Sequence, residues 1–143
     1  MIGRKALDDQ HWAHLADIVG GKSQPMLGRL MALNDRIERA FRDYERHFDA
    51  DTLGELPERR WSGQEKADLL ACYNGKGEAL SRLKADIEDA QDTRLEGFCP
   101  FCGVAKAEEF DHYAPKETFP HVAVHALNLV PCCGRCNRVK SEA

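Results

Sequence analysis

Apolar residues recur at intervals of three and four through the first 90 residues of the chain, which is the pattern of helices that bury one face. The apolar residues form four such runs along the chain, each of which is called a stripe here because it lies on one face of a predicted helix. Ser62 and Glu65 form a capping box at the start of the third, because each side chain can accept from the other's backbone N–H. The stripes are Trp12, Leu15, Ala16 and Val19; Leu27, Leu30, Asn34, Ile37, Phe41, Tyr44 and Phe48; Leu69, Leu70 and Tyr73; and Leu80, Leu83, Ile87 and Ala90.

Glycine and proline mark the boundaries of these helices. Gly20-Gly21 ends the first, and Pro25 opens a second, long helix that is predicted to run to Phe48. The opposite face of this helix mixes arginines with acids, which is typical of a solvated, ion-paired surface. Residues 49–60 are predicted to form a loop and residues 74–77 a turn.

The composition changes at Gly97, where helix formers give way to Cys, Pro, Val and His. Residues 109–113 and 126–130 are expected to form two antiparallel strands, and a helix is expected from Arg135 onward. The sequence therefore predicts an α+β protein with a helical scaffold or partner-binding region over residues 1–96 and a small module over residues 97–143.

Two Cys-x-x-Cys pairs, Cys99/Cys102 and Cys133/Cys136, bracket this module. Four thiolates satisfy the tetrahedral preference of Zn²⁺, so a structural zinc is expected to join the two ends. Only Cys133 has the correct spacing to Cys136, so the preceding Cys132 is expected to be a buried neighbour or a free thiol. Cys72, on an apolar helix face, is expected in the core. A redox role for the pairs is less consistent with the pattern, because no βαβ unit surrounds them.

The charge of the chain limits its partners. The chain has 143 residues and a net charge of −4, and neither half has the basic surplus of proteins that hold nucleic acid by charge alone. It shows neither a membrane-spanning apolar run nor a signal-peptide core, so a cytoplasmic protein without a membrane partner is expected.

Hard oxygen ligands lie between the cysteine pairs. A strand–loop–strand–helix order would bring Asp111 near Asn137, and both side chains suit Mg²⁺ or Mn²⁺. Neighbouring side chains on a strand point to opposite faces, so His112 would face away from Asp111 unless the strand ends or bulges there. With such a distortion, His112 could take a proton from water beside the metal.

Asp111-His112, then Asn128, then Cys133-x-x-Cys136-Asn137-x-x-Lys140 resemble the HNH endonucleases, the ββα-metal family, in a variant whose third signature residue is Asn. The resemblance covers the last third of the chain. It implies a zinc-stapled ββα-metal module with catalytic Mg²⁺ or Mn²⁺ on Asp111 and Asn137, and with His112 as the general base. Asn128 would hold the loop after the first strand.

The resemblance also implies a nucleic-acid substrate, DNA rather than RNA, and a role in bacterial or phage DNA processing or defence. Lys116, Arg135, Arg138 and Lys140 are the expected phosphate contacts. His121 and His125 lie in the same loop and could be secondary metal or phosphate contacts, but a structural or solvent-exposed role is expected for both.

Two other hypotheses remain open. A non-catalytic zinc-binding adaptor or DNA-binding module would fit the acidic charge. A toxin or effector nuclease would use the N-terminal helices to bind a protein partner, and the same helices could also form a homodimer.

Overall fold

The computed structural model describes residues 11–75, 77–90 and 97–142, apart from the side chains of residues 140–142. A mainly helical N-terminal part was expected, and the structure has it. No helix in the described ranges combines the length and the apolar character that crossing a bilayer requires. The elements of this part are α1 (His11–Gly20), α2 (Met26–Ala32), α3 (Asn34–Asp49), the 3-10 turn η1 (Leu53–Glu55), α4 (Gly63–Asn74) and α5 (Glu78–Asp89).

The long helix predicted from Pro25 to Phe48 is wrong in one respect, because it breaks at Leu33 into α2 and α3. The N–H of Leu33 donates to the carbonyl of Leu30 (3.0 Å), which is the tighter 3-10 spacing. This turn brings Leu33 into the core and leaves Asn34, which the predicted stripe included, exposed. The capping box predicted at Ser62 and Glu65 is present at the start of α4.

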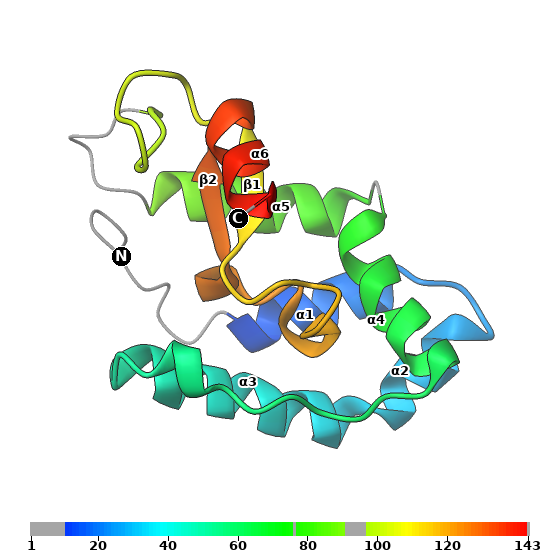
Figure 1. Ribbon diagram of the computed structural model, residues 1–143. Helices are drawn as coiled ribbons and strands as arrows, with labels where there is room; N and C mark the ends of the chain where they lie inside the picture. The colour runs from blue at the N-terminus through cyan, green and yellow to red at the C-terminus, as the bar shows by residue number, and fades with distance from the viewer. Residues whose placement is uncertain (1–10, 76, 91–96, 143) are drawn as a thin grey trace.

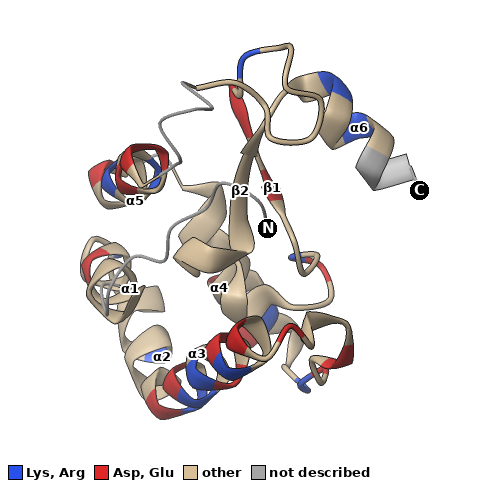
Figure 2. Cartoon of the chain, turned by 90° about the vertical axis from the view of Figure 1, so that its left-hand side faces the viewer, with Lys and Arg blue, Asp and Glu red and all other residues tan. Residues whose placement is uncertain are grey.

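Basic and acidic residues are interleaved along α3 (Figure 2). The charged face of α2 and α3 is ion-paired, as the sequence predicted. Arg29 donates to the carboxylate of Asp68 from Nε (2.7 Å) and from Nη2 (3.0 Å), which ties α2 to α4. Arg36 donates from Nη1 to Oε2 of Glu65 (3.0 Å) and from Nη2 to the carbonyl of Arg60 (2.9 Å). These contacts neutralise the arginines within the protein. Arg42–Glu38 and Arg46–Asp43 are further ion pairs made by arginines of α3.

The C-terminal part contains a two-stranded antiparallel sheet, so the α+β class is confirmed. β1 (Glu109–His112) pairs with β2 (Leu129–Cys132), and helix α6 (Gly134–Glu142) follows. The second strand begins three residues later than predicted. Residues 126–128 form the 3-10 turn η3 (Ala126–Asn128) instead, because the His125 side chain accepts the N–H of Leu127 and caps the turn. A further 3-10 turn, η2 (Pro120–Val122), lies in the loop between the strands.

The strand pair lies between α5 and α6 in both views of the chain (Figures 1 and 2). One hydrophobic core joins the helical part to the C-terminal part, and the division at residue 96 remains a prediction. Tyr44 of α3 is fully buried at this junction, and its hydroxyl donates to Oδ1 of Asn128 (3.1 Å). Both parts contribute fully buried side chains to the core, including Leu30, Ile37, Leu83, Ile87, Val122 and Leu129.

His121 supplies a test of this junction. Its side chain is buried, and Trp61 Nε1 donates to its Nδ1 (3.1 Å). Burial, with a smaller contribution from Arg59, lowers the pKa of His121 to about 4. In the unfolded chain a histidine titrates near 6.5, so between these values the unfolded state binds the proton and gains stability.

We therefore expect the free energy of unfolding to fall by about 2 kcal/mol more in the wild type than in His121→Asn when the pH drops from 7 to 5. The asparagine keeps an acceptor near the position of Nδ1 but does not titrate. Denaturant unfolding at a series of pH values measures the difference. Equal pH dependence in the two proteins would show that His121 is not held in its neutral form.

Candidate functional site

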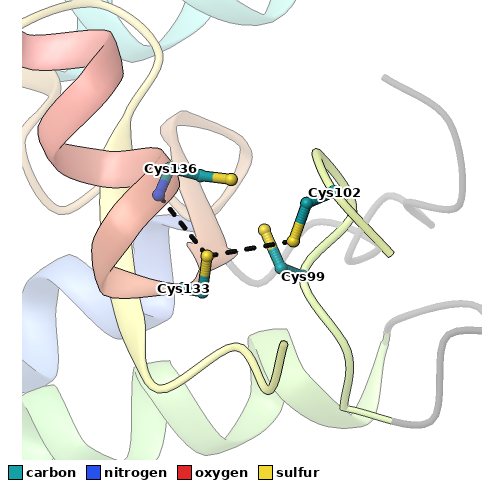
Figure 3. Close-up of side chains that lie close together, drawn as sticks. All are labelled: Cys99, Cys102, Cys133 and Cys136. Carbon is teal, nitrogen blue, oxygen red and sulfur yellow. Dashed lines mark hydrogen bonds between the residues drawn. The ribbon is translucent and has the colours of Figure 1, made fainter. Parts of the chain in front are cut away.

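Four cysteine thiols converge at one end of the strand pair (Figure 3). Their sulfur atoms all lie within 4.8 Å of one another, and Cys102 Sγ is 3.9 Å from Cys133 Sγ. Zn–S bonds of about 2.3 Å in a tetrahedron would place the sulfurs about 3.8 Å apart. The four cysteines could therefore hold a zinc ion.

The first pair is shaped by a tight turn after Cys99. The N–H of Gly103 donates to the carbonyl of Cys99 (2.7 Å), and Gly103 has a positive φ of 69°, which favours glycine. The N–H of Cys99 donates in turn to the carbonyl of Ala105 (2.8 Å), which closes the loop. The second pair lies at the start of α6, where the N–H of Cys136 donates to Cys133 Sγ (3.4 Å).

The electrostatics of the cluster favour a cation. Backbone N–H groups of Ala105 and Val104 lower the pKa of Cys102 to about 6. For Cys99, burial raises the pKa, but N–H groups outweigh it and the net pKa is lowered. The neighbouring Cys133 sulfur, followed by burial, raises the pKa of Cys136 to about 12. Four thiolates thus repel one another unless a positive ion lies between them, and the donor set fits Zn²⁺.

The other two cysteines lie outside this cluster. Cys132 is fully buried, and burial raises the pKa of its thiol to about 12. Cys72 lies in the core, where its thiol is 3.6 Å from the carbonyl of Asp68, and burial raises its pKa to about 11.

The two faces of β1 meet different parts of the protein. Asn137 Nδ2, on α6, donates to Oε2 of Glu109 (2.9 Å), and alternation along a strand places Asp111 on the same face as Glu109. This face therefore carries two carboxylates, of which Glu109 contacts the amide of Asn137. Hard oxygen donors of this kind suit Mg²⁺ or Mn²⁺, but the proximity of Asp111 to Asn137 stays a prediction. Glu109 was missed in the sequence, although its spacing of two residues from Asp111 was a usable signal.

His112 lies at the end of β1, on the face opposite to Asp111. Its Nε2 is 2.9 Å from the carbonyl oxygen of Ala123. A carbonyl can only accept, so Nε2 carries the hydrogen and Nδ1 is the basic nitrogen. The ring of Tyr73 packs edge-on at 4.4 Å between centroids. Burial lowers the pKa of His112, so its neutral form is favoured.

The pairing of β1 with β2 has no bulge: it runs without interruption from Glu109 opposite Cys132 to His112 opposite Leu129. The strand does end at His112. His112 was predicted to act beside Asp111 only if the strand ended or bulged there, so the first of these two conditions is met.

Asn128 is fully buried, and all of its polar side-chain atoms are bonded. Its Oδ1 accepts from the N–H of Ala114 (2.7 Å) and from the hydroxyl of Tyr44. Its Nδ2 donates to the carbonyls of Ala114 (3.2 Å) and Val122 (3.0 Å). Asn128 thus fixes both ends of the loop that runs from β1 to η2, and this loop also carries Lys116.

The predicted phosphate contacts lie in two places. Lys116 Nζ is 3.4 Å from Oδ1 of Asn74 and lies over the ring of Tyr73. Arg135 and Arg138 are exposed on α6. Lys140 belongs to the same helix, but its side chain is outside the part of the chain that the structure describes.

A second group of potential ligands consists of His11, Glu45 and His125. The sequence allows His125 as a secondary metal contact, but it does not predict the grouping of this residue with His11 and Glu45. His125 Nδ1 accepts the N–H of Leu127 (3.1 Å), so Nε2 must carry the hydrogen that bonds to Oε1 of Glu45 (3.2 Å). A metal on Nε2 would require that nitrogen without its hydrogen. This group is therefore a buried hydrogen-bonded junction between α3 and η3, and His125 has a structural role.

A comparison with curated proteins finds Septu protein PtuB of Bacillus thuringiensis, which is 44% identical to this chain over 36 residues. The match spans 25% of this chain and 14% of the length of that protein. No family model and no solved structure matches the chain. The similarity is local, so the function has to be argued from the site.

The metal content tests the cysteine cluster. We expect about one zinc per chain in the purified wild type, and its loss in Cys99→Ser, because three thiolates and a hydroxyl bind zinc much more weakly. Cys132→Ala is the matched control and should keep its zinc, because Cys132 is next to a ligand but not in the cluster. Elemental analysis measures both. A zinc-free wild type, or an equal loss in Cys132→Ala, would contradict this assignment.

Asn128→Ala tests the buried amide. It leaves the N–H and the carbonyl of Ala114 and the Val122 carbonyl without their partner, so we expect a loss of about 3 kcal/mol in the free energy of unfolding. Asn34→Ala, at an exposed asparagine, should change it by less than about 0.5 kcal/mol. Denaturant titration of both variants makes the comparison. A loss below about 1 kcal/mol for Asn128→Ala would show that the loop does not depend on this side chain.

Proposed function

We propose that this chain is a metal-dependent endonuclease of the HNH type that hydrolyses phosphodiester bonds in nucleic acid, DNA in preference to RNA. The observation that supports the proposal most is the state of His112: Nε2 is bonded to the carbonyl of Ala123, which makes Nδ1 the basic nitrogen, at the end of β1. A neutral imidazole held in one tautomer is what a general base requires.

Each residue of the proposed site has a separate role in the reaction. Asp111 and Asn137 are the proposed ligands of a catalytic Mg²⁺ or Mn²⁺, and Glu109 lies on the same face of β1. When bound, such an ion supplies positive charge to the phosphate as negative charge develops in the transition state. His112 takes the proton of the attacking water at Nδ1. Asn128 positions the loop whose Ala123 carbonyl orients the imidazole.

The cysteine cluster is proposed to bind structural zinc. Asn137 directly follows Cys136, so a zinc that fixes the first turn of α6 also fixes the start of the proposed catalytic face. In this arrangement the zinc does no chemistry, because four protein ligands leave no open position.

The second candidate is a non-catalytic zinc-binding adaptor or DNA-binding module, and the net charge of −4 favours it. Acidic surfaces suit a protein partner or a second copy of the chain better than unaided contact with DNA. In either case the N-terminal helices are the proposed partner-binding region. A role in bacterial or phage DNA processing or defence is part of the proposal.

Plasmid nicking with Mg²⁺ or Mn²⁺ tests the nuclease. We expect zinc-loaded wild type to cut, and His112→Ala to lose at least about 100-fold in rate, which is typical for removal of a general base. His47→Ala, at a histidine on α3 that bonds to Thr52, is the matched control and should cut like the wild type. Cleavage of an RNA substrate in parallel measures the preference for DNA.

Equal cleavage by His112→Ala and the wild type would remove His112 from the mechanism. Absence of cleavage of both DNA and RNA by zinc-loaded wild type, with either ion, would favour the adaptor.

A further inference from the structure

Two lysines from different parts of the chain share one aromatic ring beside His112. Lys84 of α5 and Lys116 of the loop after β1 each place Nζ 5.1 Å from the centroid of the Tyr73 ring. Lys84 Nζ also lies 5.5 Å from the ring of Phe110, on β1. The Tyr73 ring in turn packs edge-on against His112 at 4.4 Å.

These lysines differ from most of the arginines of the helical part. Arginines of α2, α3 and α5 are neutralised by acids, as in Arg29–Asp68, Arg36–Glu65 and Arg82–Asp17. Among the described residues, Lys84 and Lys116 form no ion pair. A cation over an aromatic face is held in place but keeps its charge, so it remains able to bind an anion.

The two lysines lie on the side of β1 that is opposite to its carboxylates. The carboxylates of β1, Glu109 and Asp111, belong by alternation to the strand face toward α6, whereas Phe110 and His112 lie on the other face. Lys84, Lys116 and Tyr73 are each half-buried, so their charges and ring are presented in a fixed arrangement.

We propose that Tyr73, Lys84 and Lys116 form a phosphate-binding site through which the helical part holds a nucleic-acid strand beside His112. The inference rests on the proposed function, because it takes its substrate from there. It adds that α4 and α5 contribute to substrate binding and are not only a scaffold. Phosphate contacts of this kind position a strand without reading its sequence.

Binding can be measured separately from cleavage. The His112→Ala chain, zinc-loaded and without Mg²⁺ or Mn²⁺, is titrated against fluorescent single-stranded DNA, duplex DNA and RNA at several salt concentrations. Lys84→Met and Lys116→Met are compared in this background, since methionine keeps much of the packing but removes the charge. Lys66→Met, at an exposed lysine of α4, is the matched control.

We expect each of the two site variants to bind about three- to tenfold more weakly. Each should also reduce the slope of log affinity against log salt by about 1, because one phosphate contact is lost. Lys66→Met should leave both quantities unchanged. The probe with the largest loss identifies whether a single strand, a duplex or RNA occupies the site.

The outcomes separate this site from the nuclease proposal. Cleavage that depends on His112, together with unchanged binding by Lys84→Met and Lys116→Met, would overturn the phosphate site and leave the nuclease intact. Binding that depends on both lysines in a chain that never cuts would support the site and overturn the nuclease. Equal weakening by Lys66→Met, or no binding to any of the three probes, would overturn the site, because its charges would then have no specific role.

Discussion

The buried carboxamide of Asn128 is the contact on which the C-terminal part of the structure depends. It bonds to the backbone of Ala114 in both directions, to the carbonyl of Val122 and to the hydroxyl of Tyr44. Each of these groups is far from water, so each would cost free energy if its partner were missing. One side chain therefore fixes the loop between the strands, the turn η3 before β2 and the contact of that turn with α3.

With the loop fixed, β1 separates two kinds of chemistry by simple alternation. Its acids, Glu109 and Asp111, lie on the face toward α6, whose first turn carries Cys136 and Asn137. Phe110 and His112 lie on the other face, where they meet Tyr73 and Lys84 from the helical part. The strand ends at His112, and the proposed mechanism needs the two faces to act on one bond there.

The sequence predicted the features that depend on local spacing. Helical stripes, the capping box at Ser62, the two strands and the choice of Cys133 over Cys132 all follow from intervals of two to four residues. The break at Leu33 and the late start of β2 were missed, because burial of Leu33 and the capping of η3 by His125 arise from the folded environment.

The contacts of Glu109 and Lys84 were missed for a related reason. Asn137 lies beside Glu109, and Lys84 beside Phe110, only after distant segments have packed. Spacing along the chain cannot report such pairs. The signature residues of the resemblance indicated where the chemistry should be, but not which neighbours would surround it.

The contact between Tyr44 and Asn128 also limits how this protein can be recombined. The hydroxyl that completes the bonding of Asn128 belongs to α3, so a buried amide of the last third of the chain has one of its partners in the helical part. Joined to an unrelated helical region, the last third would keep its cysteines and signature residues, yet would lose a bond that its central amide needs. We would expect lineages that exchange one part to exchange the other, or to change positions 44 and 128 together.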